Sequence, residues 1–246
     1  MKIYLFTAIE PAYKKDFYRQ IRSQNMRVTG ITAAIVTCTT LITHIITLYL
    51  PIAKSLPLGQ WGPLIIIQRL LVISSAIIAI LIYLIRRKLP YLQQNRYHFL
   101  VILYSLCFIG SCMALTFLAQ HNPKNTMTMM LIGLLVIAMV EVFSFTQLLS
   151  ICLLTGATFS FYLHLFQVDP VQLVGNLNIF WLMMCAFFVV SRLLYSYHAN
   201  YFIKIKTIEQ KNEEIAAANK LKTEILGIVA HDLRSPISGI RSVLHL

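Results

Sequence analysis

The sequence predicts an all-α membrane protein in which a six-helix transmembrane bundle is followed by a polar cytoplasmic helix. Three observations support this fold class. Hydrophobic residues make up 58% of the 246 residues and charged residues only 12%, whereas soluble domains are about 45–50% apolar and about a quarter charged. The mean hydropathy is +0.71. The apolar residues also fall into six runs, and the basic residues gather between and beside them.

Each predicted span is an apolar run of about 20 residues, the length that an α-helix needs to cross about 30 Å of hydrocarbon. The six spans are 28–50, 64–85, 97–118, 127–143, 146–166 and 173–195. Helix-breaking residues separate most of them, among them Pro51, Pro90, Pro123 and Pro170. The boundary between the fourth and fifth spans is the least distinct, with Glu141 close to the predicted turn.

The distribution of Lys and Arg predicts the orientation of these spans. Basic residues cluster in 1–27, between the second and third spans, and after the sixth span, while each remaining connection carries one at most. Because basic segments resist translocation, both termini are expected in the cytoplasm. The net charge of +12 is therefore attributed to membrane-flanking segments, and no nucleic-acid partner is expected. The long charged lead before the first apolar run excludes a cleavable signal peptide.

The cysteines predict neither disulfides nor a metal site. All five lie inside apolar runs, without paired spacing and without histidines at metal-ligand offsets. They are Cys38, Cys107, Cys112, Cys152 and Cys185.

Between 201 and 221 the chain becomes polar and charged and contains neither Gly nor Pro, which favours a continuous helix. Steps of three and four residues separate most members of a mainly apolar set: Ile205, Ile208, Asn212, Ile215, Asn219, Leu226 and Val229. This spacing is typical of a parallel coiled coil whose two Asn residues fix register and partner number, and it predicts a homodimer. A single amphipathic helix lying on the membrane or against the bundle accounts for the same spacing, and this stretch leaves both interpretations open.

A short motif follows this helix at the end of an apolar helical run. It consists of His231, Asp232, Leu233, Arg234, Ser235 and Pro236. The motif resembles the H-box of the sensor histidine kinases of two-component systems, in which the His is followed by an acidic, an aliphatic, a basic and a small polar residue and then by Pro. One departure lies upstream, where Leu226 or Ile228 replaces the Phe that is common in the family.

The residue types of the motif suit phosphoryl transfer to a histidine. His231 is the candidate phosphoacceptor, which must present a neutral imidazole, so the protein contributes mainly positioning and charge control. Asp232 could accept a hydrogen bond from the second ring nitrogen and select the tautomer. Arg234 could balance phosphate charge, and Ser235 occupies the position that the resemblance links to phosphatase activity. A solvated Arg234 and a Ser235 that merely fills the helix are the plain alternatives.

The resemblance implies a protein-histidine kinase of the bacterial inner membrane that uses ATP and Mg²⁺ and passes the phosphoryl group to a response regulator. No Gly-rich phosphate loop precedes the motif, and the sequence stops at Leu246. We therefore expect an N-terminal fragment that is inactive alone and ends in a truncated dimerisation and histidine-phosphotransfer domain. The expected parts are a basic N-terminus (1–27), the sensor bundle (28–197), the signalling helix (198–221) and the start of the phosphoacceptor domain (222–246).

The signal is expected to reach the spans themselves, because no predicted outer loop is long enough for a folded sensor domain. Ionisable and aromatic residues within spans are the usual pointers to such a site. The candidates for binding a small lipophilic ligand are His44, Arg69, Tyr162, His164 and Trp181. Simpler interpretations are an Arg69 that reaches the membrane surface and two histidines that satisfy each other or main-chain carbonyls.

The architecture also resembles the α-hydroxyketone quorum-sensing kinases, whose ligands are small amphiphilic autoinducers. Two other classes of function compete with a receptor kinase. A six-span transporter or channel subunit with a regulatory tail would show repeat symmetry and broken helices near the middle of the membrane. A membrane adaptor would use the tail only to recruit a partner.

Overall fold

The computed structural model describes the backbone of residues 3–49, 58–89, 95–119, 127–166 and 170–244, and the side chains of these residues except 58–61, 95–96, 170–171 and 232–244. The chain divides into two compact units, Met1–Ala199 and Asn200–Leu246, which are described separately below. All regular structure among the described residues is helical, so the predicted all-α class is confirmed.

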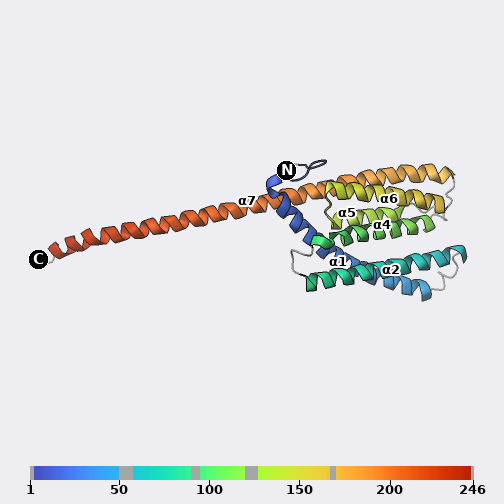
Figure 1. The fold of residues 1–246 in the computed structure, drawn as a ribbon, viewed down its shortest axis with the longest axis horizontal. Helices are drawn as coiled ribbons and strands as arrows, with labels where there is room; N and C mark the ends of the chain where they lie inside the picture. The colour runs from blue at the N-terminus through green and yellow to red at the C-terminus, as the bar shows by residue number, and fades with distance from the viewer. Residues whose placement is uncertain (1–2, 50–57, 90–94, 120–126, 167–169, 245–246) are drawn as a thin grey trace. The chain divides into compact units, whose positions relative to one another are not determined.

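Within the described ranges, six α-helices and one short 3₁₀-helix follow each other along the chain (Figure 1). They are α1 (Pro11–Tyr49), α2 (Leu58–Lys88), η2 (Asn95–His98), α4 (Phe99–Ala119), α5 (Thr128–Val140), α6 (Phe145–Leu165) and α7 (Pro170–Leu244). Residues 3–10 form an irregular N-terminal segment before α1. Pro11 opens α1, a position where a missing N–H costs nothing because the first amides of a helix have no intrahelical acceptor.

Five of these helices are long and apolar enough to cross a membrane, namely α1, α2, α4, α6 and α7. The chain is therefore a multi-pass membrane protein. In the predicted fourth span, 127–143, the helix is shorter than the apolar run. Helix α5 has 13 residues and measures about 20 Å at 1.5 Å per residue. This is less than the roughly 30 Å of a hydrocarbon core, so a sixth crossing stays a prediction.

The uncertain boundary between the predicted fourth and fifth spans is a short extended connection at residues 141–144. The backbone of Glu141 is extended, with φ −118° and ψ 136°. Ser144 then caps α6: its hydroxyl accepts the N–H of Gln147, and the Gln147 side chain accepts the N–H of Ser144. This reciprocal pair satisfies two amides that the start of a helix leaves without partners.

Helix α4 lies at the centre of the first unit. More than half of the residues in its apolar membrane-spanning stretch are buried, whereas less than a quarter are buried in the corresponding stretches of the other four long helices. It contacts α2, α5 and α6, while α1 packs along α2. A side chain at Gly133 of α5 would stand 2.9 Å from the Cβ of Cys112 on α4, so glycine permits the close approach of these two helices.

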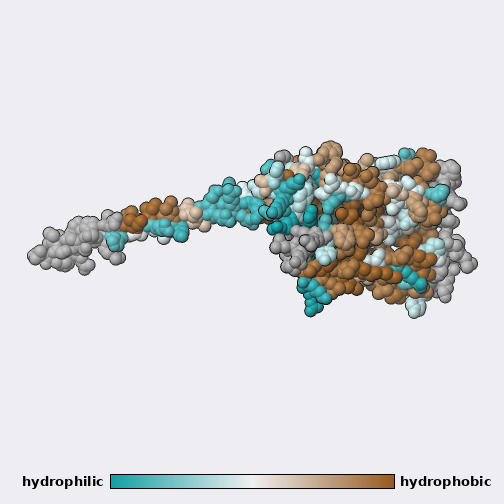
Figure 2. All heavy atoms as spheres, in the orientation of Figure 1, coloured by the Kyte–Doolittle hydropathy of each residue, from teal (hydrophilic) through white to brown (hydrophobic). Residues whose placement is uncertain are grey.

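The outer surface of the first unit is apolar. Large side chains such as Ile42, Ile73, Leu153 and Leu182 are more than half exposed, and Figure 2 shows this surface in brown over the helices of the bundle. Soluble monomers rarely expose apolar patches of this extent. Such a surface suits contact with lipid.

Helix α7 is helical throughout Pro170–Leu244. In the second unit the residues of the predicted coiled-coil spacing are mostly exposed, including Ile208, Ile215, Leu226 and Val229. Lys206 and Glu209 form an exposed ion pair of 2.7 Å one turn apart, which contributes little to stability.

Candidate functional site

His231, the predicted phosphoacceptor, is exposed on α7. About 46 Å of helix separates it from Asn200 at 1.5 Å per residue. The side chains of Asp232, Arg234 and Ser235 lie outside the described residues, so the arrangement around the imidazole stays a prediction.

Two of the predicted ligand-binding residues, His44 and Arg69, belong to the α1–α2 pair. His44 is largely buried, and its Nδ1 lies 3.1 Å from Oε1 of Gln68 on α2. Gln68 in turn donates to the hydroxyl of Thr47 on α1 at 3.4 Å. Arg69, the next residue along α2, is exposed. His44 therefore bonds across this helix pair to Gln68 and not to His164.

The other three predicted residues belong to α6 and α7. His164 is exposed, whereas Tyr162 is half-buried against Phe117 of α4, with ring centroids 6.0 Å apart. Trp181 is largely exposed and meets the ring of Phe180 edge-on at 5.6 Å.

A single pocket shared by the five predicted residues is not found among the described cavities. Of the five, only Trp181 lines one of them, an apolar groove of about 620 Å³ between α6 and α7. The groove is floored by Phe159 and Phe180, whose rings stack at 4.0 Å. Contact of each of the five residues with a ligand stays a prediction.

The most polar buried feature of the first unit is Arg192 on α7, which the sequence analysis did not select. Its side chain is fully buried and donates to three main-chain carbonyls of the N-terminal segment. Nε donates to the oxygen of Leu5 at 2.8 Å, and Nη2 donates to those of Thr7 at 2.9 Å and of Tyr4. The ring of Tyr195 stands 4.3 Å from the guanidinium carbon, within the range of a cation–π contact.

Further hydrogen bonds tie the N-terminal segment to the same stretch of α7. The N–H of Tyr4 donates to the hydroxyl of Ser196 at 2.8 Å, and the N–H of Ile9 donates to the hydroxyl of Tyr195 at 3.3 Å. The hydroxyls of Tyr195 and Tyr18 on α1 lie 3.2 Å apart. Arg192, Tyr195, Ser196 and the N-terminal segment together form what is called here the α7 clasp.

A second buried polar cluster holds the connection between α5 and α6. The carboxylate of Glu141 is buried and accepts hydrogen bonds from Thr29 of α1 at 2.8 Å and from Ser105 of α4. Asn25 of α1 both donates to the carbonyl of Val142 at 2.8 Å and accepts its N–H at 3.1 Å. Glu141 has no basic partner among the described residues, so hydroxyl donors alone solvate it.

A cavity of about 400 Å³ lies between these two clusters, bounded by the N-terminal segment, α1 and the α5–α6 connection. His98 of η2 lines it and is largely buried. Burial, with a smaller effect of the nearby Arg22, lowers the pKa of His98 to about 4, although a hydrogen bond with Gln147 acts in the opposite direction. His98 is therefore neutral at physiological pH.

Both clusters were missed by sequence reasoning for the same reason. Ionisable residues within apolar runs were the available signal, and Arg192 and Glu141 each interrupt such a run. Their partners, however, lie 185–188 residues away for Arg192 and as far as 112 residues away for Glu141. No local spacing marks pairs so distant in the sequence.

The two clusters thus attach the N-terminal segment to α7, and the α5–α6 connection to α1 and α4.

In comparisons with known proteins, the chain matches no protein-family model, no curated protein and no solved structure.

Proposed function

We propose that this chain is the sensory and signal-transmitting part of a bacterial inner-membrane histidine kinase, with His231 as the phosphoacceptor and both termini in the cytoplasm. The observation that carries the proposal is the order His-Asp-Leu-Arg-Ser-Pro at residues 231–236, placed on a polar helix that follows several apolar ones. The exposure of His231 is compatible with this role, because a phosphoacceptor must be reached by its donor.

In this proposal the residues of the motif position the reacting imidazole. Asp232 holds the proton on the ring nitrogen that does not attack, Arg234 balances phosphate charge, and Ser235 orients a water in the reverse, phosphatase direction. As the resemblance to histidine kinases implies, ATP is the phosphoryl donor together with Mg²⁺, and a response regulator receives the phosphoryl group.

The input of this receptor is a small lipophilic molecule, for which we propose the groove between α6 and α7. Its volume of about 620 Å³ falls in the range of small-molecule sites, about 300–1,000 Å³. Its lining is mainly apolar, with Ser160, Trp181 and two cysteines as polar or polarisable contacts. A ligand with one hydroxyl or carbonyl group suits this composition.

The output is a displacement of α7 relative to the N-terminal segment that it holds in the α7 clasp. A ligand shifts an equilibrium between two arrangements only if it binds them with different affinity. The groove and the clasp share α7, since Trp181 and Met184 line the groove and Arg192 lies two to three turns further along. Ligand binding would thus favour one packing of α7 against the N-terminal segment.

In this proposal, the second unit is the part through which two copies of the chain form a homodimer and through which the change in α7 reaches His231. Its exposed apolar residues at coiled-coil spacing, such as Ile208 and Ile215, would be covered by the same helix of a second copy. The register of this pair would then set how His231 is presented.

Autophosphorylation of the product of the complete reading frame tests the proposal. Membrane vesicles that contain it are given ATP labelled on the γ-phosphate, and the protein is examined for a label that survives base and is lost in acid, as a phosphorus–nitrogen bond requires. We expect labelling of the unaltered protein and at least a hundredfold less labelling of His231→Gln, since the substitution removes the nucleophile.

His198→Gln is the matched control, because it removes a histidine from the same helix outside the motif. It is expected to retain the label. Absence of label from the unaltered protein, or equal label on His231→Gln, would contradict the proposal and favour a transporter or adaptor whose tail only resembles the motif.

A further inference from the structure

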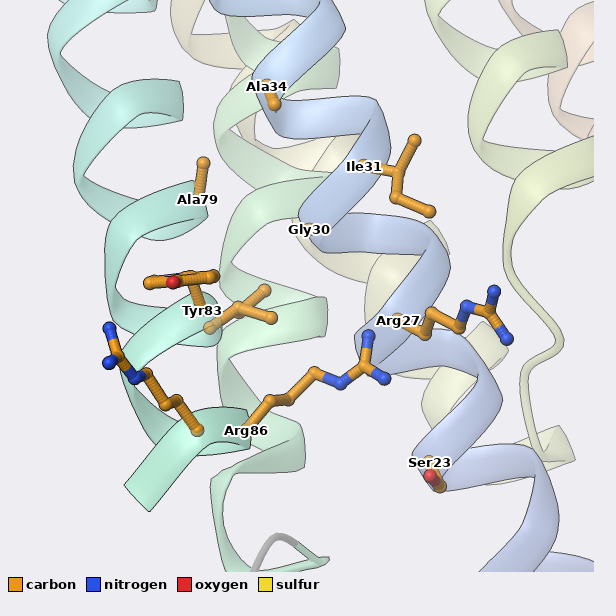
Figure 3. Close-up of a pocket in the computed structure, with 10 residues that line it drawn as sticks. Ser23, Arg27, Gly30, Ile31, Ala34, Ala79, Tyr83 and Arg86 are labelled. Atoms are coloured by element: carbon orange, nitrogen blue, oxygen red, sulfur yellow. The ribbon is translucent and has the colours of Figure 1, made fainter. Parts of the chain in front are cut away.

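A pocket of about 750 Å³ lies between α1 and α2, where the middle of α1 meets the C-terminal end of α2. Its lining residues come in equal numbers from the two helices: Ser23, Arg27, Gly30, Ile31 and Ala34 from α1, and Ala79, Ile82, Tyr83, Arg86 and Arg87 from α2. Figure 3 shows Arg86 extending from α2 across the gap toward α1, where Arg27 lies.

Positive charge is concentrated at one end of this pocket. Arg27, Arg86 and Arg87 are all exposed, and none of the ten lining residues is acidic. Neither Arg27 nor Arg87 forms an ion pair with a described carboxylate. Arginines thus line the pocket from both helices, Arg27 from α1 and Arg86 and Arg87 from α2, and the planar guanidinium suits the oxygens of a phosphate.

The pocket becomes apolar along both helices in the same direction. On α1 the residues change from Ser23 and Arg27 to Ile31 and Ala34, and on the antiparallel α2 they change from Arg86 to Ala79. The distance from Ser23 to Ala34 is about 16 Å along the helix, close to the half-thickness of a hydrocarbon core. A charged end and an apolar end at this separation match one phospholipid in one leaflet.

The floor and the opening of the pocket fit the same ligand. A side chain at Gly30 would stand 2.9 Å from Cγ2 of Ile82, so the two helices are nearly in contact at the floor. Ile31 and Ala34, by contrast, are exposed, so the apolar wall opens to the lipid-facing surface. A free anion would leave this wall uncovered, whereas acyl chains would cover it.

We propose that the pocket between α1 and α2 binds an anionic phospholipid, with its phosphate on Arg27, Arg86 and Arg87, its glycerol or headgroup hydroxyls near Ser23 and Tyr83, and an acyl chain along Ile31, Ala34 and Ala79. Basic pockets between transmembrane helices are a known means of recognising lipid headgroups. The proposal concerns a site separate from the proposed phosphoacceptor and from the α6–α7 groove.

Lipid binding to the purified 246-residue chain tests this site. The delipidated protein is titrated with phosphatidylglycerol or phosphatidylcholine of identical acyl chains, and bound lipid is counted by native mass spectrometry while the melting temperature is followed. We expect tighter binding of phosphatidylglycerol. Arg27→Gln and Arg86→Gln are each expected to weaken its binding about fivefold.

Lys88→Gln is the matched control, since it removes one positive charge from the same end of α2 outside the pocket. It is expected to bind phosphatidylglycerol as the unaltered chain does. Ala34→Trp keeps every charge and fills the apolar end from an exposed position, so it is expected to reduce lipid binding. Inorganic phosphate and glycerol 3-phosphate form the remaining arms of the experiment.

Three results would overturn the proposal. Equal binding of phosphatidylglycerol and phosphatidylcholine would show that the negative charge of the headgroup does not contribute to binding. An equal loss on Lys88→Gln would show attraction to the basic helix ends without a specific site. Stabilisation by inorganic phosphate or glycerol 3-phosphate equal to that by phosphatidylglycerol, with no effect of Ala34→Trp, would show a small-anion site instead of a lipid site.

Discussion

Arg192 and Glu141, a basic and an acidic residue, are buried inside the bundle, and the hydrogen-bond partners of each are neutral groups. The guanidinium of Arg192 is held by main-chain carbonyls, and the carboxylate of Glu141 by two hydroxyls. Burying an ionisable group is costly unless its hydrogen-bonding capacity is filled. Ionisable residues that are buried in spite of this cost are the best candidates for a functional role.

Arg192→Gln is expected to loosen the α7 clasp. The substitution shortens the donor and leaves carbonyl oxygens of Tyr4, Leu5 and Thr7 without partners, at a cost of about 1–3 kcal/mol for each orphaned group. The melting temperature in detergent should fall, and chymotrypsin should cut faster within residues 3–10. Arg69→Gln, at an exposed site on α2, should change neither. Equal cleavage rates of the two variants would contradict the clasp.

His98 is expected to make the bundle sensitive to acid. Its pKa is lowered from 6.5 to about 4, so between these values the unfolded chain binds a proton that the folded chain does not. Stability is therefore fully present above about pH 6.5 and falls as the pH drops toward 4, by up to about 3 kcal/mol. Melting temperatures measured from pH 7 to pH 4 should decline less in His98→Gln than in the unaltered chain. Parallel declines would exclude His98 as the cause.

At the scale of the elements, the sequence predicted the helices and missed what fixes their ends. Apolar runs placed α2, α4, α6 and the first part of α7 correctly, because lipid requires long apolar helices whatever their neighbours are. The break between α5 and α6 was harder, since apolar residues continue on both sides. Ser144 followed by Gln147 is a capping signature that was present in the sequence and could have located the start of α6.

The predicted ligand residues failed to converge for a different reason. Position along an apolar run shows only that a residue lies within a predicted span, and this is what singled out His44, Arg69 and His164. The direction in which each side chain points depends on helix packing, which no single-sequence pattern contains. Position within a span, without the direction of each side chain, therefore grouped residues that belong to separate helix pairs.

Gly156→Leu is expected to block the groove between α6 and α7. Gly156 lines the groove, and a Cβ there meets no atom within 4 Å, so the larger side chain fills space without distorting the helix. For a medium-chain α-hydroxyketone, the concentration that gives a half-maximal change in His231 labelling should rise at least about tenfold, equivalent to about 1.4 kcal/mol.

Gly175→Leu provides the control for this test. Gly175 is also a helical glycine with open space around its Cβ, but it does not line the groove. The same concentration dependence in both variants would place the ligand elsewhere.

At the scale of the whole molecule, one helix belongs to both compact units. The first unit carries the apolar bundle and its buried polar clusters, and the second carries the polar helix with His231. Within the second unit, a continuous helix transmits rotation and translation along its axis, so the proposed signal needs no joint there.

Insertions into the Ala216–Ala218 run of the second unit test transmission by rotation. One inserted residue turns everything downstream by about 100°, whereas seven restore the coiled-coil register. In the complete protein, the single insertion should change basal labelling of His231 at least several-fold, and the seven-residue insertion should retain the response. Equal effects of both insertions would rule out a dependence on register.

The three carbonyl oxygens that hold Arg192 belong to the main chain, which every amino acid provides. The exposed residues Leu5 and Thr7 could therefore be exchanged widely with no loss of this attachment, whereas Tyr4 is buried against the ring of Tyr195 and could not. Reporter proteins and purification tags are therefore better kept away from this segment.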